Sequence, residues 1–163
     1  MASKEEYGQF LGVIRKQTGL EMLVPDADGL VTVRVQDEYN VGLQFVEETE
    51  KILCFVEAMT LPPNAGKAVY RELLAGGLFG KETAGGYFTL EPQTETVVYN
   101  YFFDFAPAAA DPEGFVETLE KILSLMDLWN ERIRTLLEAD GQAPETGKEI
   151  SLESLRGGFV LKP

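Results

Sequence analysis

The chain contains no histidine and only one cysteine among its 163 residues. Histidine is the side chain that most often transfers protons near neutral pH, and it is also the most common metal ligand. The single cysteine, Cys54, cannot form an internal disulfide, and it lies in the apolar run Ile52–Val56, where a small buried hydrophobe is expected. A reactive cysteine usually depends on a histidine or another activating group nearby. The composition therefore predicts that this protein is not an enzyme.

Basic residues are also few, and long apolar runs are absent. The sequence has 14 Lys and Arg against 27 Asp and Glu, a formal net charge of -13, whereas nucleic-acid binding needs clustered positive charge. No stretch approaches the roughly 20 apolar residues that span a bilayer, and the opening residues Met1–Glu6 have no apolar signal core. We expect a cytoplasmic protein with no nucleic-acid partner and no membrane insertion.

Two segments resemble ligand-binding loops without meeting their requirements. Residues 76–82 are one residue short of a phosphate-binding loop and place Glu82 where Ser or Thr would bind magnesium. Residues 26–29 begin like a calcium-binding loop but lack the third oxygen ligand and the later glutamate. We therefore expect neither segment to bind a phosphate or a metal.

Carboxylates offer the remaining chemistry. Glu47, Glu48 and Glu50 are close in sequence, but a solvated hairpin explains them better than a metal site, since no histidine could complete one. Asp104 lies among aromatic residues, where a carboxylate can become reactive. A structural position at the sheet edge, or a pair with a lysine, is the preferred interpretation. Catalysis at Asp104 or Cys54 is the alternative.

Helical periodicity marks three segments. Ser3 and Glu6 form a predicted capping box for a first helix, which ends at Thr18–Gly19. A second helix is predicted to be capped by Asn64, and a third to begin at Asp111–Pro112 and to run to about residue 139. Apolar residues repeat along one face of each: Tyr7, Phe10, Leu11 and Ile14, then Val69, Tyr70, Leu73 and Leu74, then Phe115, Leu119, Ile122, Met126, Trp129, Ile133 and Leu136.

Apolar alternation and short turns mark five strands. They are Val31–Val35, Val41–Val46, Lys51–Met59, Tyr87–Leu90 and Thr96–Phe105. Short turns make the first three strands antiparallel neighbours, and the third, apolar on both faces, is expected to be central and covered on both sides. The order α-β-β-β-α-β-β-α predicts an α+β fold with an antiparallel five-stranded sheet and helices packed against it.

A C-terminal extension, residues 141–163, follows the predicted domain of residues 1–140. It is polar first and apolar later, with Ile150, Leu152, Leu155, Phe159, Val160 and Leu161. These are too many apolar residues for a simple disordered tail. We expect the extension to dock on the domain or on a dimer mate; the alternative is that it occupies a binding groove until a partner arrives.

The order of elements, the acidic character and one local pattern together resemble a known family. The local pattern is Leu73-Leu74-Ala75-Gly76-Gly77-Leu78-Phe79 followed by Gly85-Gly86-Tyr87-Phe88-Thr89-Leu90-Glu91. It is similar to the leucines that end helix two, the loop and the short strand of class I type III secretion chaperones, the Tir-chaperone (CesT-like) family. The resemblance covers about residues 4–139.

The resemblance implies a function and two sets of site residues. Members are cytoplasmic homodimers without a cofactor that bind the N-terminal region of a secreted effector in extended form and deliver it to the secretion ATPase. Helix two and its neighbouring strand would form the dimer interface through Val69, Tyr70, Leu73, Leu74, Leu78 and Phe79. Helix one and the sheet would bind the effector through Phe10, Leu11, Ile14, Val33, Val35, Leu43 and Phe45. The alternative is a binding or regulatory module of the same fold that works outside secretion.

Overall fold

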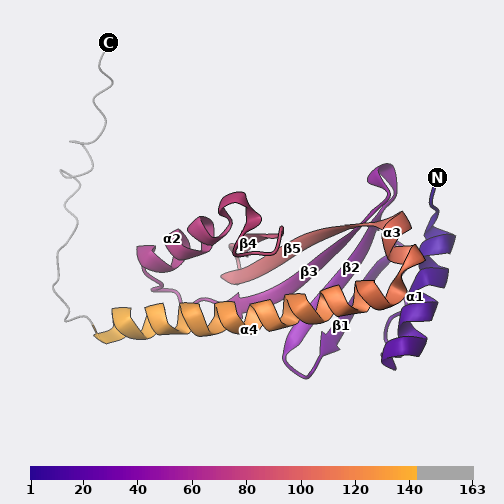
Figure 1. Ribbon diagram of the computed structural model, residues 1–163. Helices are drawn as coiled ribbons and strands as arrows, with labels where there is room; N and C mark the ends of the chain where they lie inside the picture. The colour runs from indigo at the N-terminus through magenta and orange to yellow at the C-terminus, as the bar shows by residue number, and fades with distance from the viewer. Residues whose placement is uncertain (143–163) are drawn as a thin grey trace, which may run out of the picture.

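The computed structural model describes residues 1–142 and confirms the predicted α+β fold (Figure 1). Five antiparallel strands form one sheet in the order β1-β2-β3-β5-β4. The strands are β1 (Leu30–Val35), β2 (Tyr39–Val46), β3 (Lys51–Thr60), β4 (Tyr87–Glu91) and β5 (Thr96–Asp104). The helices are α1 (Lys4–Thr18), α2 (Lys67–Gly76), α3 (Phe105–Ala110) and α4 (Pro112–Gln142), with the 3-10 turns η1 (Glu47–Thr49) and η2 (Leu78–Gly80).

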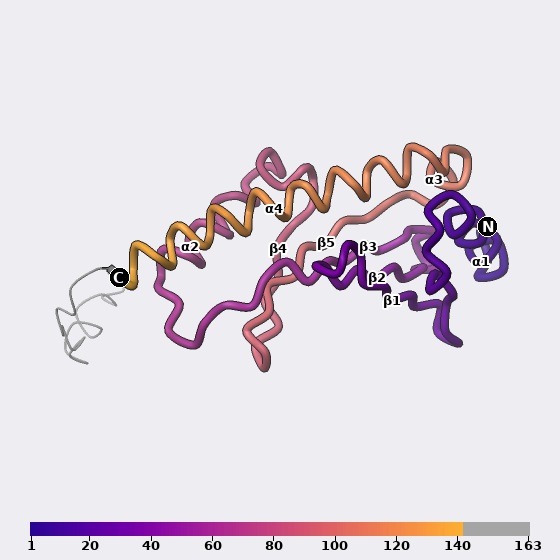
Figure 2. Tube along the Cα trace, turned by 90° about the horizontal axis from the view of Figure 1, so that it is seen from below, coloured from indigo at the N-terminus to yellow at the C-terminus, as the bar shows by residue number. Residues whose placement is uncertain are grey.

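The helices pack against one face of the sheet. Figures 1 and 2 show α4 running across the sheet, with α1 and α3 near its N-terminal end and α2 beside its C-terminal half. The apolar face of α4 predicted from the sequence therefore serves the core, because Ile122, Met126 and Trp129 are buried against the sheet side. β3 is central, as predicted, but it is not covered on both faces. Leu53 and Phe55 on its other face are only half-buried, since the helices lie opposite.

Aromatic rings join α1 to the sheet and to the start of α4. Tyr7 stacks on Phe45 of β2 with 5.3 Å between ring centroids, and Phe10 meets Phe115 of α4 edge to face at 5.0 Å. Phe105 contacts both Phe10 and Phe45 at 5.9 and 5.3 Å. Edge-to-face pairs of this kind add stability beyond the burial of their apolar area. They join α1 to β2 and to the start of α4.

The predicted helix ends are confirmed for α1 and for the start of α4. Ser3 and Glu6 form the capping box, with the Glu6 amide donating to Ser3 Oγ at 3.2 Å and the Ser3 amide to Glu6 Oε2 at 2.8 Å. Gly19 ends α1 with φ of 70°, a conformation that glycine adopts without strain. Asp111 Oδ1 accepts a bond from the Gly114 amide at 3.0 Å, which caps the first turn of α4.

Three predicted boundaries are wrong. Asn64 does not cap the second helix, because the chain turns at residues 63–64 and α2 starts from Gly66, which has no side chain to donate or accept. Phe105 does not end the fifth strand; it begins the additional helix α3 and is buried among the aromatic rings. Gly141 lies inside α4, which continues to Gln142, because a helix tolerates a glycine near its end at modest cost. The predicted docking of residues 143–163 lies outside the described residues.

A side-chain network fixes α4 over a bulge in the central strand. The pairing of β3 with β5 shifts register between Glu57 and Met59, so Ala58 is an extra residue in the strand. The side-chain amide of Asn130 donates to the Ala58 carbonyl at 2.9 Å and to the Tyr39 hydroxyl at 3.1 Å. The Tyr39 hydroxyl in turn donates to the carboxylate of Asp127 at 2.6 Å. These bonds set the position of α4 relative to β2 and β3.

Candidate functional site

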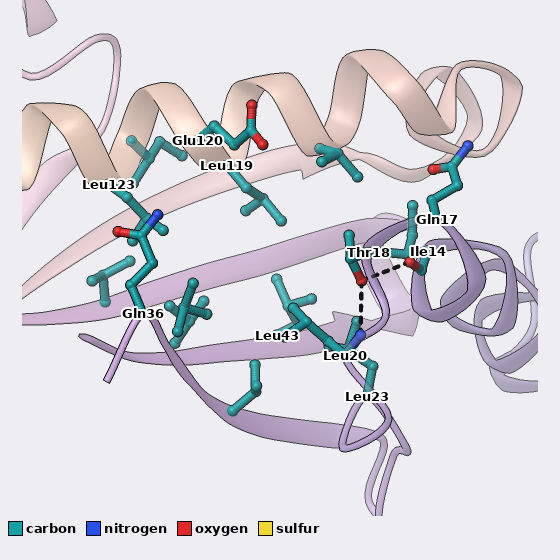
Figure 3. A pocket seen from close by; sticks show the side chains of 16 residues that line it. Ile14, Gln17, Thr18, Leu20, Leu23, Gln36, Leu43, Leu119, Glu120 and Leu123 are labelled. Atoms are coloured by element: carbon teal, nitrogen blue, oxygen red, sulfur yellow. Dashed lines mark hydrogen bonds between the residues drawn. The ribbon is translucent and has the colours of Figure 1, made fainter. Parts of the chain in front are cut away.

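An apolar groove of about 450 Å³ lies between the C-terminal turn of α1, the covered face of the sheet and the N-terminal half of α4. Figure 3 shows its side chains converging from these elements. That volume lies in the range of pockets that hold several side chains of a bound ligand. The groove is lined by Ile14, Gln17, Thr18, Leu20, Leu23, Val33, Val35, Gln36, Val41, Leu43, Val56, Val116, Leu119, Glu120, Ile122 and Leu123.

The floor of the groove is a row of valines from three strands. Val33 pairs with Val41 across β1 and β2, and Val41 pairs with Val56 across β2 and β3. Leu43 continues the floor, and all four side chains are buried. Facing β-branched side chains pack well across a sheet and leave a smooth apolar surface. The floor therefore offers no polar group to a ligand, only contact area.

The walls of the groove carry the groups that a ligand meets first. Leu119 extends from α4 toward Leu43, as Figure 3 shows, and is half-buried. Polar residues Gln17, Gln36 and Glu120 are exposed around the rim. Thr18 Oγ1 donates to the Ile14 carbonyl at 2.8 Å and accepts from the Leu20 amide at 3.3 Å, which turns the chain so that the segment after α1 closes one end.

A free strand edge runs along the same side of the molecule. β1 is the first strand of the sheet, and within residues 1–142 its only strand partner is β2. An unpaired edge presents backbone N–H and C=O groups that can bind an extended chain. Val33 and Val35 belong both to this edge strand and to the groove lining. An extended peptide paired with β1 could therefore place alternate side chains into the groove.

The structure divides the predicted effector-binding residues into two groups. Ile14, Val33, Val35 and Leu43 line the groove. Phe10, Leu11 and Phe45 do not line it; they are buried in the adjoining core. The remaining lining includes further residues of α1, of the turn after β1 and of the sheet, and it also comes from the segment after α1 and from α4, neither of which was predicted to bind. Leu119 belongs to the apolar repeat of α4, so its burial was predictable, but its position on a groove wall was not.

A second apolar surface, the α2 patch, consists of Tyr70, Leu74, Leu78 and Phe79. The side chains of Leu74, Leu78 and Phe79 are 78%, 63% and 85% exposed. Phe79 has φ of 57° and ψ of 14°, a left-handed conformation that bulky residues rarely adopt. The two other predicted dimer residues, Val69 and Leu73, are buried in the domain. A shallow hollow between α2 and β4 extends the patch toward Leu90 of β4.

The described residues show no arrangement suited to catalysis. The carboxylate of Asp104 pairs with Lys51 Nζ at 3.3 Å and is exposed, in agreement with its preferred interpretation. Glu47, Glu48 and Glu50 are exposed. Residues 1–142 contain no group of three Asp, Glu or Cys side chains that could hold a metal ion. No helix within the same residues is long and apolar enough to cross a membrane.

Cys54 is expected to resist alkylation in the folded protein. It is fully buried, and desolvation raises the pKa of its thiol to about 12. Near pH 8, where an unfolded thiol with a pKa of about 8.5 is partly ionised, the native thiolate fraction should be about a thousandfold lower. Stability should accordingly decline above about pH 9, as the unfolded chain releases this proton and the folded chain keeps it.

The measurement is mass spectrometry after iodoacetamide treatment, with guanidinium-unfolded protein as the control. Rapid modification of the native protein would contradict the burial of Cys54 and restore it as a candidate nucleophile.

A family model and one relative match the sequence of this chain. Residues 9–130 match the model of the Tir chaperone protein (CesT) family. A protein of Chlamydia pneumoniae is 27% identical over 105 residues, which are 64% of this chain and 77% of that protein.

Solved structures share the fold. A chain of the ExsC–ExsE complex has a TM-score of 0.69 at 19% identity, covering 80% of this chain and 96% of that chain. A chain of the HopA1–SchA chaperone–effector complex has a TM-score of 0.60 at 17% identity, covering 83% and 95%. A chain of the complex between the Yersinia pestis type III secretion chaperone SycH and a stable fragment of YscM2 has a TM-score of 0.54 at 16% identity, covering 73% and 98%. Since the family match spans most of the domain, this chain belongs to the Tir chaperone protein (CesT) family.

Proposed function

We propose that this protein is a type III secretion chaperone that binds the N-terminal region of a secreted effector in extended form. The observation that carries the proposal is the open apolar groove beside an unpaired strand edge, in a chain of the CesT family. Two solved structures that share the fold, the HopA1–SchA complex and the complex of SycH with YscM2, each contain a chaperone. The acidic surface, with a net charge of -13, keeps such a carrier in solution and favours basic cargo.

The groove and the β1 edge together suit an extended chain. Backbone pairing with β1 would satisfy the polar groups of an unfolded segment, and the valine floor would accept its apolar side chains. Each Leu- or Phe-sized anchor buried in the groove contributes roughly 1.5–3 kcal/mol, which offsets the cost of ordering the segment. Binding of this kind keeps the effector unfolded without any chemical step, so no cofactor is required.

The α2 patch is proposed to join two copies of the chain. Its exposed residues Leu74, Leu78 and Phe79 are apolar side chains that neighbour one another in the chain, and the basic residues Lys67 and Arg71 flank the leucines. This local positive charge reduces the repulsion between two strongly acidic copies. We further propose that the dimer acts in the bacterial cytoplasm and presents its cargo to the secretion ATPase.

Leu119→Glu should weaken effector binding at least tenfold without unfolding the protein. Leu119 is half-buried on the groove wall, so a carboxylate there projects into the space that an effector side chain would fill. The matched control is Leu128→Glu on the same helix, because Leu128 is 69% exposed and lies outside the groove. Partners are captured from the host lysate, identified by mass spectrometry and mapped by limited proteolysis.

Protection of an N-terminal segment in one secreted partner, lost in Leu119→Glu and kept in Leu128→Glu, is the expected outcome. Capture of only non-secreted partners would favour the regulatory module of the same fold. Equal capture by both variants would remove the groove from the binding site.

A further inference from the structure

Residues 143–163 have a sequence suited to the groove. Phe159, Val160 and Leu161 are three consecutive large apolar residues, preceded by the glycines Gly157 and Gly158. The family match ends at residue 130, and α4 carries the chain to Gln142. We propose that Phe159–Leu161 binds in the groove of its own chain and must be displaced by the effector. This inference rests on the proposed function of the groove as a peptide-binding site.

Chain length decides which apolar residues can reach the groove. About 23 residues of α4 separate Gln142 from Leu119 in the groove wall, a distance of roughly 35 Å at 1.5 Å per residue. An extended chain spans at most about 3.3–3.6 Å per residue, so Ile150 reaches no farther than roughly 29 Å from the helix end. Phe159 reaches more than about 55 Å on the same basis. Leu123, the groove residue of α4 nearest to Gln142, lies about 28 Å from it along the helix, so Ile150 reaches only that end of the groove. The segment Phe159–Leu161 reaches Leu119 with length to spare.

The charge of residues 143–163 is also compatible with binding of Phe159–Leu161 in the groove. Residues 143–163 contain three acidic and three basic side chains, so the whole net charge of -13 lies on residues 1–142. A neutral segment is not repelled by this acidic surface. Lys162 directly follows the apolar triplet, and Glu120 is exposed on the groove rim. An ammonium next to Leu161 would therefore meet a carboxylate where the apolar contact ends.

Attachment to the same chain makes a modest affinity sufficient. A linker of this length gives its segment an effective concentration on the order of 1 mM at the groove. Three buried side chains at roughly 1.5–3 kcal/mol each are enough to fill the groove at that concentration after ordering costs. An effector segment that brings more anchors, and pairs with β1 as well, would displace it. The groove would then be covered in the free chaperone and open to cargo alone.

Paramagnetic relaxation in the full chain tests this contact directly. A nitroxide on Pro163→Cys should broaden the methyl resonances of Val33, Val35 and Leu119, while the buried Cys54 stays unlabelled. Adding Phe159→Asp and Leu161→Asp should abolish the broadening. The matched control Ile150→Asp should preserve it, because residue 150 cannot reach beyond the end of the groove at Leu123 to Leu119. Absence of broadening in the Pro163→Cys protein, or its loss in the Ile150→Asp control, would overturn the proposal.

A mixed sample and a peptide complete the test. Broadening that appears only when spin-labelled protein is mixed with isotope-labelled protein would assign the contact to a second copy and overturn binding within one chain. A synthetic peptide of residues 157–163 should bind the Phe159→Asp/Leu161→Asp variant about tenfold more tightly than the unaltered chain, whose groove is occupied. Equal affinities would contradict the proposal. No effector is used, so failure here leaves the chaperone function standing, and failure to find an effector leaves this result intact.

Discussion

Leu74→Glu combined with Phe79→Glu should convert the proposed homodimer to a monomer. Both side chains are largely exposed in the single chain, so their substitution removes interface contacts and leaves the core unchanged. A two-fold interface contains every substitution twice, and a central apolar anchor contributes about 2 kcal/mol or more. The dissociation constant of the dimer should therefore rise at least about a thousandfold. Multi-angle light scattering and sedimentation velocity across a dilution series measure it.

Leu128→Glu is the control for this experiment. Leu128 is an exposed leucine like Leu74, but it lies on α4 outside the α2 patch. Its substitution adds the same negative charge and should leave the dimer intact. Thermal unfolding should separate loss of assembly from loss of fold, since the double variant is expected to keep the domain folded. A dimer that persists in Leu74→Glu/Phe79→Glu at the same affinity would exclude the α2 patch as the interface.

Local signals explain why so much of the fold could be predicted. The capping box of Ser3 and Glu6 and the Asp111–Pro112 helix start act within a few residues, and both were confirmed, as were the five strands and the antiparallel neighbours predicted from apolar runs and short turns. Errors arose where tertiary packing outweighed a local preference. The apolar neighbours of Phe105 predict that it belongs to the fifth strand. It instead packs against Phe10 and Phe45 and lies in a separate helix.

The groove could not be predicted because its wall residues look like core residues. Leu119 and Ile122 are neighbouring members of the apolar repeat of α4, yet Ile122 is buried and Leu119 is half-buried at the groove. Their burial differs because of the position of α4 on the sheet. That position depends on the bond between Asn130 and the bulged Ala58 carbonyl. Such a contact joins residues 72 positions apart. No periodicity in the sequence encodes it.

Two glycines near α2 are also required by tertiary contacts that the sequence alone does not reveal. α2 ends at Gly76, the first residue of the Gly76-Gly77 pair. Tertiary packing also requires a glycine at this position, because a Cβ at residue 76 would overlap the indole of Trp129. Gly86 likewise lies where a Cβ would overlap the Tyr99 hydroxyl and approach the Asn100 carbonyl at 2.6 Å. Glycine here allows α2 and β4 to approach their neighbours closely, which brings the α2 patch and the edge strand β4 together.

Trp129→Ala should lower the free energy of unfolding by about 3–5 kcal/mol, the largest loss expected from a single truncation in this domain. Trp129 is only 2% exposed, and its ring lies 5.0 Å from that of Phe88 in β4. Its indole N–H donates to the Glu82 carbonyl at 3.0 Å, and the Arg132 guanidinium stacks 4.6 Å from its centroid. Truncation therefore opens a cavity, leaves the Glu82 carbonyl without this donor and removes the ring on which Arg132 stacks.

Matched variants separate these contributions. Trp129→Phe keeps most of the ring but loses the N–H, so it should cost about 1–3 kcal/mol, and Leu128→Ala at the exposed neighbouring position should change stability by less than about 0.5 kcal/mol. Urea unfolding followed by circular dichroism gives the three values. A loss below about 1 kcal/mol for Trp129→Ala would contradict this packing.

The effects of Trp129→Ala should extend from the stability of the domain to the assembly of the proposed dimer. Arg132 also pairs with Glu72 of α2 and with Glu82 in the segment before β4, so Trp129 and Arg132 together hold α2 and that segment on α4. Loosening this contact should weaken the dimer as well as the fold, because the α2 patch depends on the position of α2. The groove lies at the opposite end of α4. Binding of an effector segment by folded Trp129→Ala protein should therefore be preserved, and its loss would show that groove and α2 patch are coupled through α4.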